Sequence, residues 1–230
     1  MAKRLSKNQK KVNELFDKNK EYSLLEAMEI AKKTSYTKFD ASVDISLNLN
    51  LDTRKAEQQL RGSVLLPNGT GKNIRTLVAT DNLEQQKASK EAGADIVVNA
   101  VDLEEILKKE KFDFDVMVAE PKMMITLGKY GKVLGPKGLM PNPKTGTVTP
   151  DTAKAVEELK KGKANYRADK SGIIHSLIGK VSMDAQKLAE NADTLIQLIK
   201  KLKPATVKGT YMKSIYVSTT MGPAIKVKVE

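Results

Sequence analysis

The segment from Gly128 to Val148 constrains the fold of this chain more than any other stretch. It contains five glycines, three prolines and four lysines, and no acidic residue. Glycine and proline at this density disfavour a regular helix and a central strand, so the pattern predicts a shaped cationic loop. We expect its first four glycines to allow positive φ or close backbone approach, while Pro136, Pro141 and Pro143 reduce the entropy lost on ordering. A long solvated connection is the alternative that composition leaves open.

Chain length and residue composition exclude several classes of protein. The chain has 230 residues, enough for one large or two small domains, and its lack of tryptophan and cysteine predicts an aliphatic core without disulfides, thiolate catalysis or a cysteine metal site. No stretch approaches the roughly 18 apolar residues of a membrane span. The basic N-terminus lacks the apolar run of a secretory signal. We therefore expect a soluble protein of the reducing cytoplasm, with no membrane partner.

The positive charge is unevenly distributed. Forty basic and 28 acidic residues give a net charge of +12, which is typical of a protein that binds a polyanion. Eleven acids and five bases occupy residues 81–120, whereas ten bases and three acids occupy residues 122–167, and residues 200–228 contain seven lysines and no acid. One part of the molecule should therefore face water or protein, and the others phosphate.

The spacing of apolar residues changes twice along the chain. Ser23 to Glu26 forms a capping box for a helix, and alternating apolar residues from Val43 to Leu51 predict a strand with one buried face. Strands and helices then alternate in residues 74–128, which predicts parallel pairing and a small Rossmann-like domain. A two-residue period returns after residue 164. We expect Asp102, with Glu105, to cap one helix of the middle segment, and Ser182 to cap the long helix near the C-terminus.

The sequence contains no complete motif for enzymatic chemistry. Gly69-Thr70-Gly71-Lys72-Asn73 has Leu66 where the first glycine of a phosphate loop belongs and Asn73 in place of Ser or Thr, so it predicts a turn between domains. His175 is the only histidine and more simply satisfies a local hydrogen bond near the sheet. We predict no catalytic residue, metal, cofactor or small-molecule substrate.

RNA recognition fits the residues better. A-form RNA presents sugars and 2′-hydroxyls in a shallow minor groove, where small hydroxyl side chains and flat apolar contacts can read it. Ser218-Thr219-Thr220-Met221-Gly222 offers hydroxyls, a thioether and a glycine that lets the RNA backbone approach. Phe39, beside Lys38, offers a stacking face. Each feature alone has a plain structural explanation, as core or strand residues.

Two long blocks carry a family resemblance. The block from Gly128 to Val148 and the block from Lys213 to Pro223 resemble the two signatures of the L-one family of large-subunit ribosomal proteins, which belong to the mobile stalk beside the tRNA exit site. The resemblance implies an α/β (α+β) fold of two domains. Residues 1–67 and 160–230 would form a discontinuous α+β sandwich domain that binds rRNA. Residues 68–159 would form an inserted Rossmann-like α/β domain, with a hinge at the two crossings.

The resemblance also implies a function and a binding site. It implies a non-enzymatic constituent of the cytoplasmic ribosome that binds stalk rRNA, assists release of deacylated tRNA from the exit site, contacts other ribosomal components, and represses translation by binding the mRNA leader of its own operon. The RNA-binding positions of the family fall here on Lys38, Phe39, Ser42, Asp169, Ser214, Thr220, Met221 and Gly222. Lys132, Lys137 and Lys144 of the glycine-rich loop would form a secondary RNA contact or part of the hinge.

Two other functions compete with this prediction. A nucleotide-dependent enzyme on the α/β segment is disfavoured by the failed glycine motifs. A general cationic RNA scaffold would show strong, sequence-independent salt sensitivity.

Overall fold

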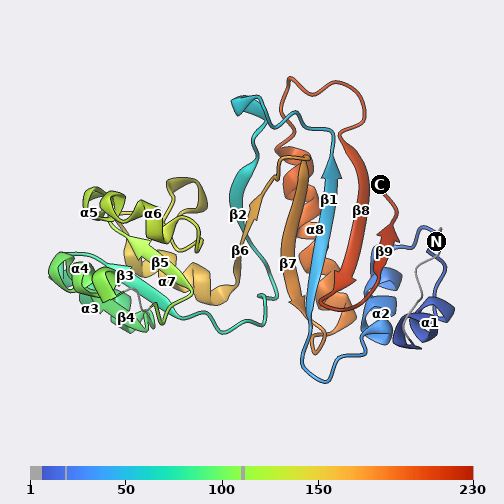
Figure 1. The fold of residues 1–230 in the computed structure, drawn as a ribbon, viewed down its shortest axis with the longest axis horizontal. Coiled ribbons are helices and arrows are strands. Elements are labelled where there is room, and N and C mark those ends of the chain that lie inside the picture. The colour runs from blue at the N-terminus through green and yellow to red at the C-terminus, as the bar shows by residue number, and fades with distance from the viewer. Residues whose placement is uncertain (1–6, 19, 110–111, 230) are drawn as a thin grey trace. The chain divides into compact units, whose positions relative to one another are not determined.

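The computed structural model describes residues 7–18, 20–109 and 112–229, and the chain divides into two compact units (Figure 1). The first unit comprises Met1–Lys72 and Ala164–Glu230, and the second comprises Asn73–Lys163. Helices and strands occur in both units, so the mixed α/β class predicted from the sequence is confirmed.

A four-stranded antiparallel sheet organises the first unit, with the strand order β7-β1-β8-β9. The strands are β1 (Ser42–Leu49), β7 (Ile173–Lys180), β8 (Met212–Thr219) and β9 (Ala224–Val227). β1 comes from the N-terminal segment, but both strands beside it come from the C-terminal segment. The sheet therefore depends on pairing between residues that lie far apart in the sequence.

Helices α2 (Leu24–Thr34) and α8 (Ala185–Lys201) cover one face of this sheet, and Figure 1 shows α8 behind β7 and β1. The predicted alternation along β1 is confirmed, because Val43, Ile45 and Leu47 are fully buried in the core formed with these helices. The predicted capping box of α2 is also present: the Glu26 backbone N–H donates to Ser23 Oγ, and the Ser23 N–H donates to the Glu26 carboxylate. The opposite face of the sheet, called the outer face below, carries mostly polar side chains.

Shorter elements complete the first unit. They are the helix α1 (Lys7–Glu14), the 3₁₀ turn η1 (Ala56–Gln58), and a two-stranded sheet of β2 (Arg61–Leu65) and β6 (Lys163–Arg167). The ring of Tyr166 occupies the space that a Cβ at position 62 would need, so Gly62 is required for the close packing of these two strands.

The second unit contains a parallel sheet with the order β4-β3-β5, as the alternating pattern predicted. Its strands are β3 (Thr76–Ala79), β4 (Ile96–Val98) and β5 (Val116–Ala119). An apolar core forms on each face: α4 (Ala100–Lys109) contributes to one and α7 (Thr152–Lys161) to the other, and α3 (Leu83–Glu91) packs against α7 and β4. Both faces of the sheet are covered, which is the arrangement expected of a parallel sheet.

The units divide a few residues later than the sequence suggested. The first crossing lies after Lys72 and not after residue 67, because Asn191 of α8 binds the turn: its Nδ2 donates to the Gly69 carbonyl at 2.9 Å, and its Oδ1 accepts the Asn68 N–H at 3.1 Å. The second crossing lies after Lys163 and not before residue 160. The whole of α7 packs on the second unit and ends at Gly162, which has a φ of 107°.

The prediction of a helix-free loop over Gly128–Val148 is wrong. Helix α6 (Gly131–Leu134) and the 3₁₀ turn η3 (Pro143–Thr145) lie within it. Helix α5 (Met124–Lys129), which follows the 3₁₀ turn η2 (Pro121–Met123), extends only into its first two residues. The buried side chain of Leu134 explains the difference, because its packing outweighs the low helix propensity of glycine. Positive φ occurs at Gly138 and Gly146 only, within this segment.

Two predicted helix caps are also wrong. α4 begins at Ala100, before Asp102, and the Ala100 N–H donates to the carboxylate of Asp81 at 3.1 Å. The N-cap of α8 is Asp184 and not Ser182, whose hydroxyl donates to Asp40 at 2.9 Å. In both cases a carboxylate distant in the sequence, Asp81 or Asp40, forms a hydrogen bond that the local sequence did not predict.

Candidate RNA-binding surface

Two segments 178 residues apart meet where β1 begins and β8 ends. The Ser42 N–H donates to Thr220 Oγ1 at 3.0 Å, and the Thr220 N–H donates to the Ser42 carbonyl at 3.1 Å. Just beyond, the Gly222 N–H donates to the Thr219 carbonyl at 3.0 Å and tightens the turn between β8 and β9. The structure thus brings together three of the predicted site residues, Ser42, Thr220 and Gly222.

Two large apolar side chains stand exposed beside this junction in the sequence. Phe39 is 58% exposed and Met221 is 57% exposed. Phe39 lies in the turn before β1, where its carbonyl accepts the Thr37 hydroxyl at 3.0 Å, and Lys38 next to it is exposed. We call Lys38, Phe39, Ser42, Thr220, Met221 and Gly222 the strand-end cluster. Its exposed ring and thioether are free of the core and can lie against a base or a sugar.

Lys180 adds a cation that sequence reasoning missed. Its Nζ donates to Ser42 Oγ at 3.2 Å and to the Asp40 carbonyl at 3.4 Å, and Ser42 faces Lys180 across the β1–β7 pairing. The Asp40 carboxylate is held in turn by the backbone N–H and hydroxyl of Ser182. A positive charge therefore stands at a fixed place beside the cluster. Sequence reasoning could have found Lys180 only from the register of β1 against β7, and that register is not known until the fold is known.

Hydroxyl groups continue from the cluster across the outer face. Ser42 and Ser46 of β1 lie on it, as do Ser214, Tyr216 and Ser218 of β8, which face Asn48, Ser46 and Asp44 respectively. His175 Nδ1 lies 2.9 Å from Ser46 Oγ, so the local hydrogen bond predicted for His175 is present.

Asp44 is the acidic member of the outer face. Burial raises its pKa, and the positive charges of His175 and Lys180 oppose that rise.

Asp169 and Ser214 lie at the other end of the sheet. Ser214 faces Asn48, six residues along β1 from Ser42, which corresponds to about 20 Å at the usual rise of a strand. The carboxylate of Asp169 accepts the N–H groups of Ser171 and Ile173 at 2.9 and 2.8 Å, and so shapes the turn between β6 and β7. The predicted residues therefore form two groups, at opposite ends of the outer face.

Comparison with known proteins places the chain in a family. Residues 31–223 match the model of the Ribosomal protein L1p/L10e family. The chain belongs to that family. Over its whole length it is 70% identical to the large ribosomal subunit protein uL1 of Mycoplasma mobile, 67% to that of Metamycoplasma arthritidis and 68% to that of Mycoplasmopsis synoviae, and each alignment covers 100% of both chains.

Membership of the L1p/L10e family confirms the predictions of a cytoplasmic ribosomal protein and not an enzyme. Among the described residues, no group of three or more His, Asp or Glu side chains could hold a metal ion, and no helix is long and apolar enough to cross a membrane. The turn at Gly69 and Gly71, considered for phosphate binding, has positive φ at both glycines and is bonded to Asn191.

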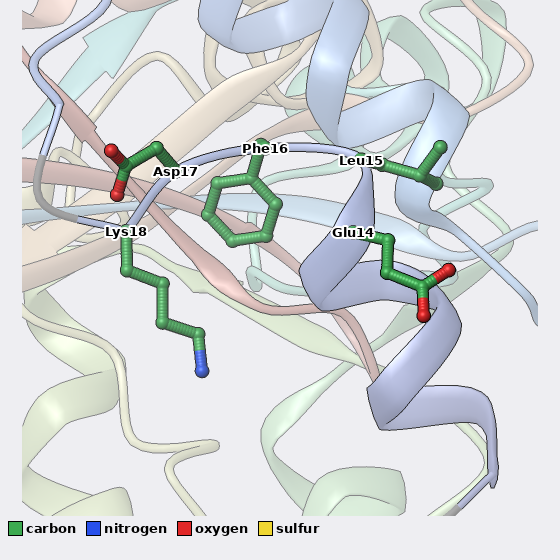
Figure 2. A pocket seen from close by; sticks show the side chains of 5 residues that line it. All are labelled: Glu14, Leu15, Phe16, Asp17 and Lys18. Atoms are coloured by element: carbon green, nitrogen blue, oxygen red, sulfur yellow. The ribbon is translucent and has the colours of Figure 1, made fainter.

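One open depression of about 530 Å³ lies near the N-terminus and is lined by five consecutive residues, Glu14 to Lys18 (Figure 2). Figure 2 shows the Glu14 carboxylate and the Lys18 amine pointing in different directions. These side chains do not converge on a common ligand, and Phe16 among them is buried in the core. The depression therefore offers no catalytic arrangement.

The three lysines of the glycine-rich segment that were predicted to contact RNA or the hinge differ in their surroundings. Lys132 and Lys144 are exposed. Lys137 is exposed too, but its Nζ lies 4.3 Å from the ring centroid of Phe112, a cation–π contact that ties the chain after α6 to the segment before β5. Phe112 in turn packs edge-on against Phe114. Lys137 thus has a structural role of its own within the second unit.

Proposed function

We propose that the protein is a structural constituent of the large ribosomal subunit that binds the stalk rRNA through its first unit. The observation that carries the proposal is the strand-end cluster. Two hydrogen-bonded segments from opposite ends of the chain present Phe39 and Met221 to solvent beside the fixed cation of Lys180. Apolar contact, small hydroxyls and a nearby charge are the groups that read an RNA minor groove and its unstacked bases.

The outer face extends the proposed contact toward Asp169 and Ser214. Its hydroxyl groups suit the sugars and 2′-hydroxyls of an A-form helix, which presents them over a wide, shallow surface. Asp169 acts here by holding the turn before β7 and not by touching phosphate, because its carboxylate already accepts two backbone N–H groups. The second unit would add a secondary RNA contact through Lys132 and Lys144.

Binding of matched RNAs tests the proposal. A stalk-type rRNA hairpin and a scrambled duplex are titrated at equal moderate salt with the wild type and with Phe39→Ala/Met221→Ala. Because each stacked base is worth about 1–3 kcal/mol, we expect the double variant to lose at least tenfold in hairpin affinity and little in duplex affinity. Leu65→Ala/Leu202→Ala, which removes two side chains of similar exposure in the same unit, serves as the control. Equal binding of both RNAs by all proteins would mean that charge alone drives association.

We further propose two roles that depend on the same surface. The bound protein assists release of deacylated tRNA from the exit site as part of the mobile stalk, and unbound protein represses translation of its own operon by binding a leader that resembles the rRNA site. The support for both is family membership, and on this proposal the rRNA and the mRNA leader would compete for the strand-end cluster. In a cell-free translation reaction, added wild-type protein should reduce synthesis from its own leader, and Phe39→Ala/Met221→Ala should not.

A further inference from the structure

The three most exposed large apolar side chains among the described residues all belong to the second unit. Leu83 is 70% exposed, Val101 is 73% exposed and Ile125 is 80% exposed. Leu83 opens α3, Val101 lies in the first turn of α4, and Ile125 is the second residue of α5. Single apolar residues on a surface are ordinary, but these three follow the three parallel strands β3, β4 and β5 in turn.

Hydrogen bonds hold the three connections together at one edge. The strands of a parallel sheet end at the same edge, so the segments after β3, β4 and β5 meet there. The Thr80 hydroxyl donates to Glu120 at 2.9 Å and joins the segment after β3 to the segment after β5. The bond from the Ala100 N–H to Asp81 joins the segment after β3 to the start of α4. Figure 1 shows α3, α4 and α5 gathered beside the strands. We call Leu83, Val101 and Ile125 the apolar edge.

The charges around the apolar edge are mainly negative. Asp81, Glu84, Asp102 and Glu120 lie within three residues of a strand end or in the first turn of the following helix, and Lys122 is the base among them. Compensation of the helix dipoles accounts for Glu84 and Asp102. It does not account for large aliphatic side chains left in water beside them. In a chain of net charge +12, this edge repels phosphate while offering apolar contact.

We propose that the apolar edge is a docking surface for a basic protein segment that carries aliphatic or aromatic side chains. Its lysines and arginines would face the four carboxylates, and its apolar side chains would cover Leu83, Val101 and Ile125. The second unit would then bind protein at the carboxyl edge of its sheet, independently of any RNA contact made by the first unit.

Chemical-shift mapping on the full-length ¹⁵N-labelled protein tests this surface. The probes are a short peptide of alternating leucine and lysine, the same peptide with glutamate for lysine, the same with serine for leucine, and a scrambled RNA duplex. We expect the leucine–lysine peptide to shift the amide signals of Leu83, Val101, Ile125 and their neighbours, and the other three probes to leave them unchanged.

Two matched variants locate the binding. Leu83→Ser/Val101→Ser/Ile125→Ser should weaken peptide binding by about tenfold or more, because the binding would lose most of its apolar contact. The control Leu25→Ser/Leu65→Ser/Leu202→Ser removes three exposed apolar side chains of the first unit and should bind as the wild type does. Retained amide dispersion shows that each variant is folded.

Any of three results would overturn the proposal. Equal peptide affinity in both variants would place the binding elsewhere, and equal shifts with the glutamate peptide would remove the role of charge. Shifts of the same amides by the RNA duplex would mean that the edge binds nucleic acid.

Discussion

Replacement of Asn191 by leucine tests whether the buried Asn191 side chain stabilises the first unit by bonding both the turn at Asn68 and Gly69 and the sheet. Asn191 is fully buried in α8 and makes three hydrogen bonds. Besides its two bonds to the turn, its Nδ2 donates to the Ile178 carbonyl at 2.8 Å. Ile178 is the extra residue of a β-bulge, since Val43 faces Gly179 and Asp44 faces Leu177. Asn191→Leu keeps a similar volume and removes all three bonds.

The cost follows from the burial of each partner. Loss of the bond to the buried Ile178 carbonyl leaves that group unsatisfied, which costs about 1–3 kcal/mol. The two bonds to the turn are partly buried and contribute about 0.5–1 kcal/mol each. We therefore expect Asn191→Leu to lower the free energy of unfolding of the first unit by about 3 kcal/mol, which corresponds to a decrease of about 10 °C in Tm for a unit of this size.

Urea unfolding followed by circular dichroism measures this loss, and amide hydrogen exchange locates it. The Asn68 N–H should exchange faster in the variant because it loses its acceptor, while amides of β3 and β5 in the second unit should be unchanged. Asn68→Ala is the matched control: it keeps that backbone N–H and removes only exposed side-chain bonds, so it should cost under about 1 kcal/mol. A loss below 1 kcal/mol in Asn191→Leu would refute the role assigned to the amide.

Three further predictions concern single residues of the first unit. Burial, with a smaller contribution from the negative charge of ionised Tyr166, raises the pKa of Tyr211 to about 12. The folded state therefore favours the neutral phenol, and this contribution to the unfolding free energy is complete below pH about 10 and is lost as pH rises toward 12. Tyr211→Phe should flatten the fall in unfolding free energy measured over that interval. Gly222→Ala places a Cβ against the hydroxyl of buried Thr219, and should cost about 1–3 kcal/mol in urea unfolding and weaken binding to the rRNA hairpin. Lys180→Gln should reduce the slope of log affinity against log salt for that hairpin by about 0.7–0.9, and an unchanged slope would show that this amine touches no phosphate.

Sequence patterns correctly predicted the elements whose structure depends on residues that are close in sequence. The capping box at Ser23 and the alternation of buried residues along β1 needed only neighbours in sequence, and both were correct. The alternating strands and helices of the middle segment likewise indicated the parallel sheet.

The errors came from contacts between residues far apart in sequence. Burial of Leu134 imposed a short helix on a glycine-rich segment, and Asp40 bound Ser182, which had been predicted to cap α8. Of the candidate site, the identities of Phe39 and Met221 were readable from residue chemistry and resemblance. The bond that joins Ser42 to Thr220, and the place of Lys180, were not, because they depend on the register of strands more than a hundred residues apart.

The position of β1 has a consequence for biosynthesis. β1 is synthesised as an amphipathic segment well before both of its partners, β7 and β8. At about 5–20 residues per second, the strand waits on the order of ten seconds for its first partner. The second unit, whose residues are continuous in the chain, is complete before then and can fold first. Throughout that interval the strand has two open edges and one apolar face. We therefore expect nascent chains stalled before Ile173 to aggregate or to recruit chaperones through β1, whereas chains released after Val227 fold with the sheet closed around it.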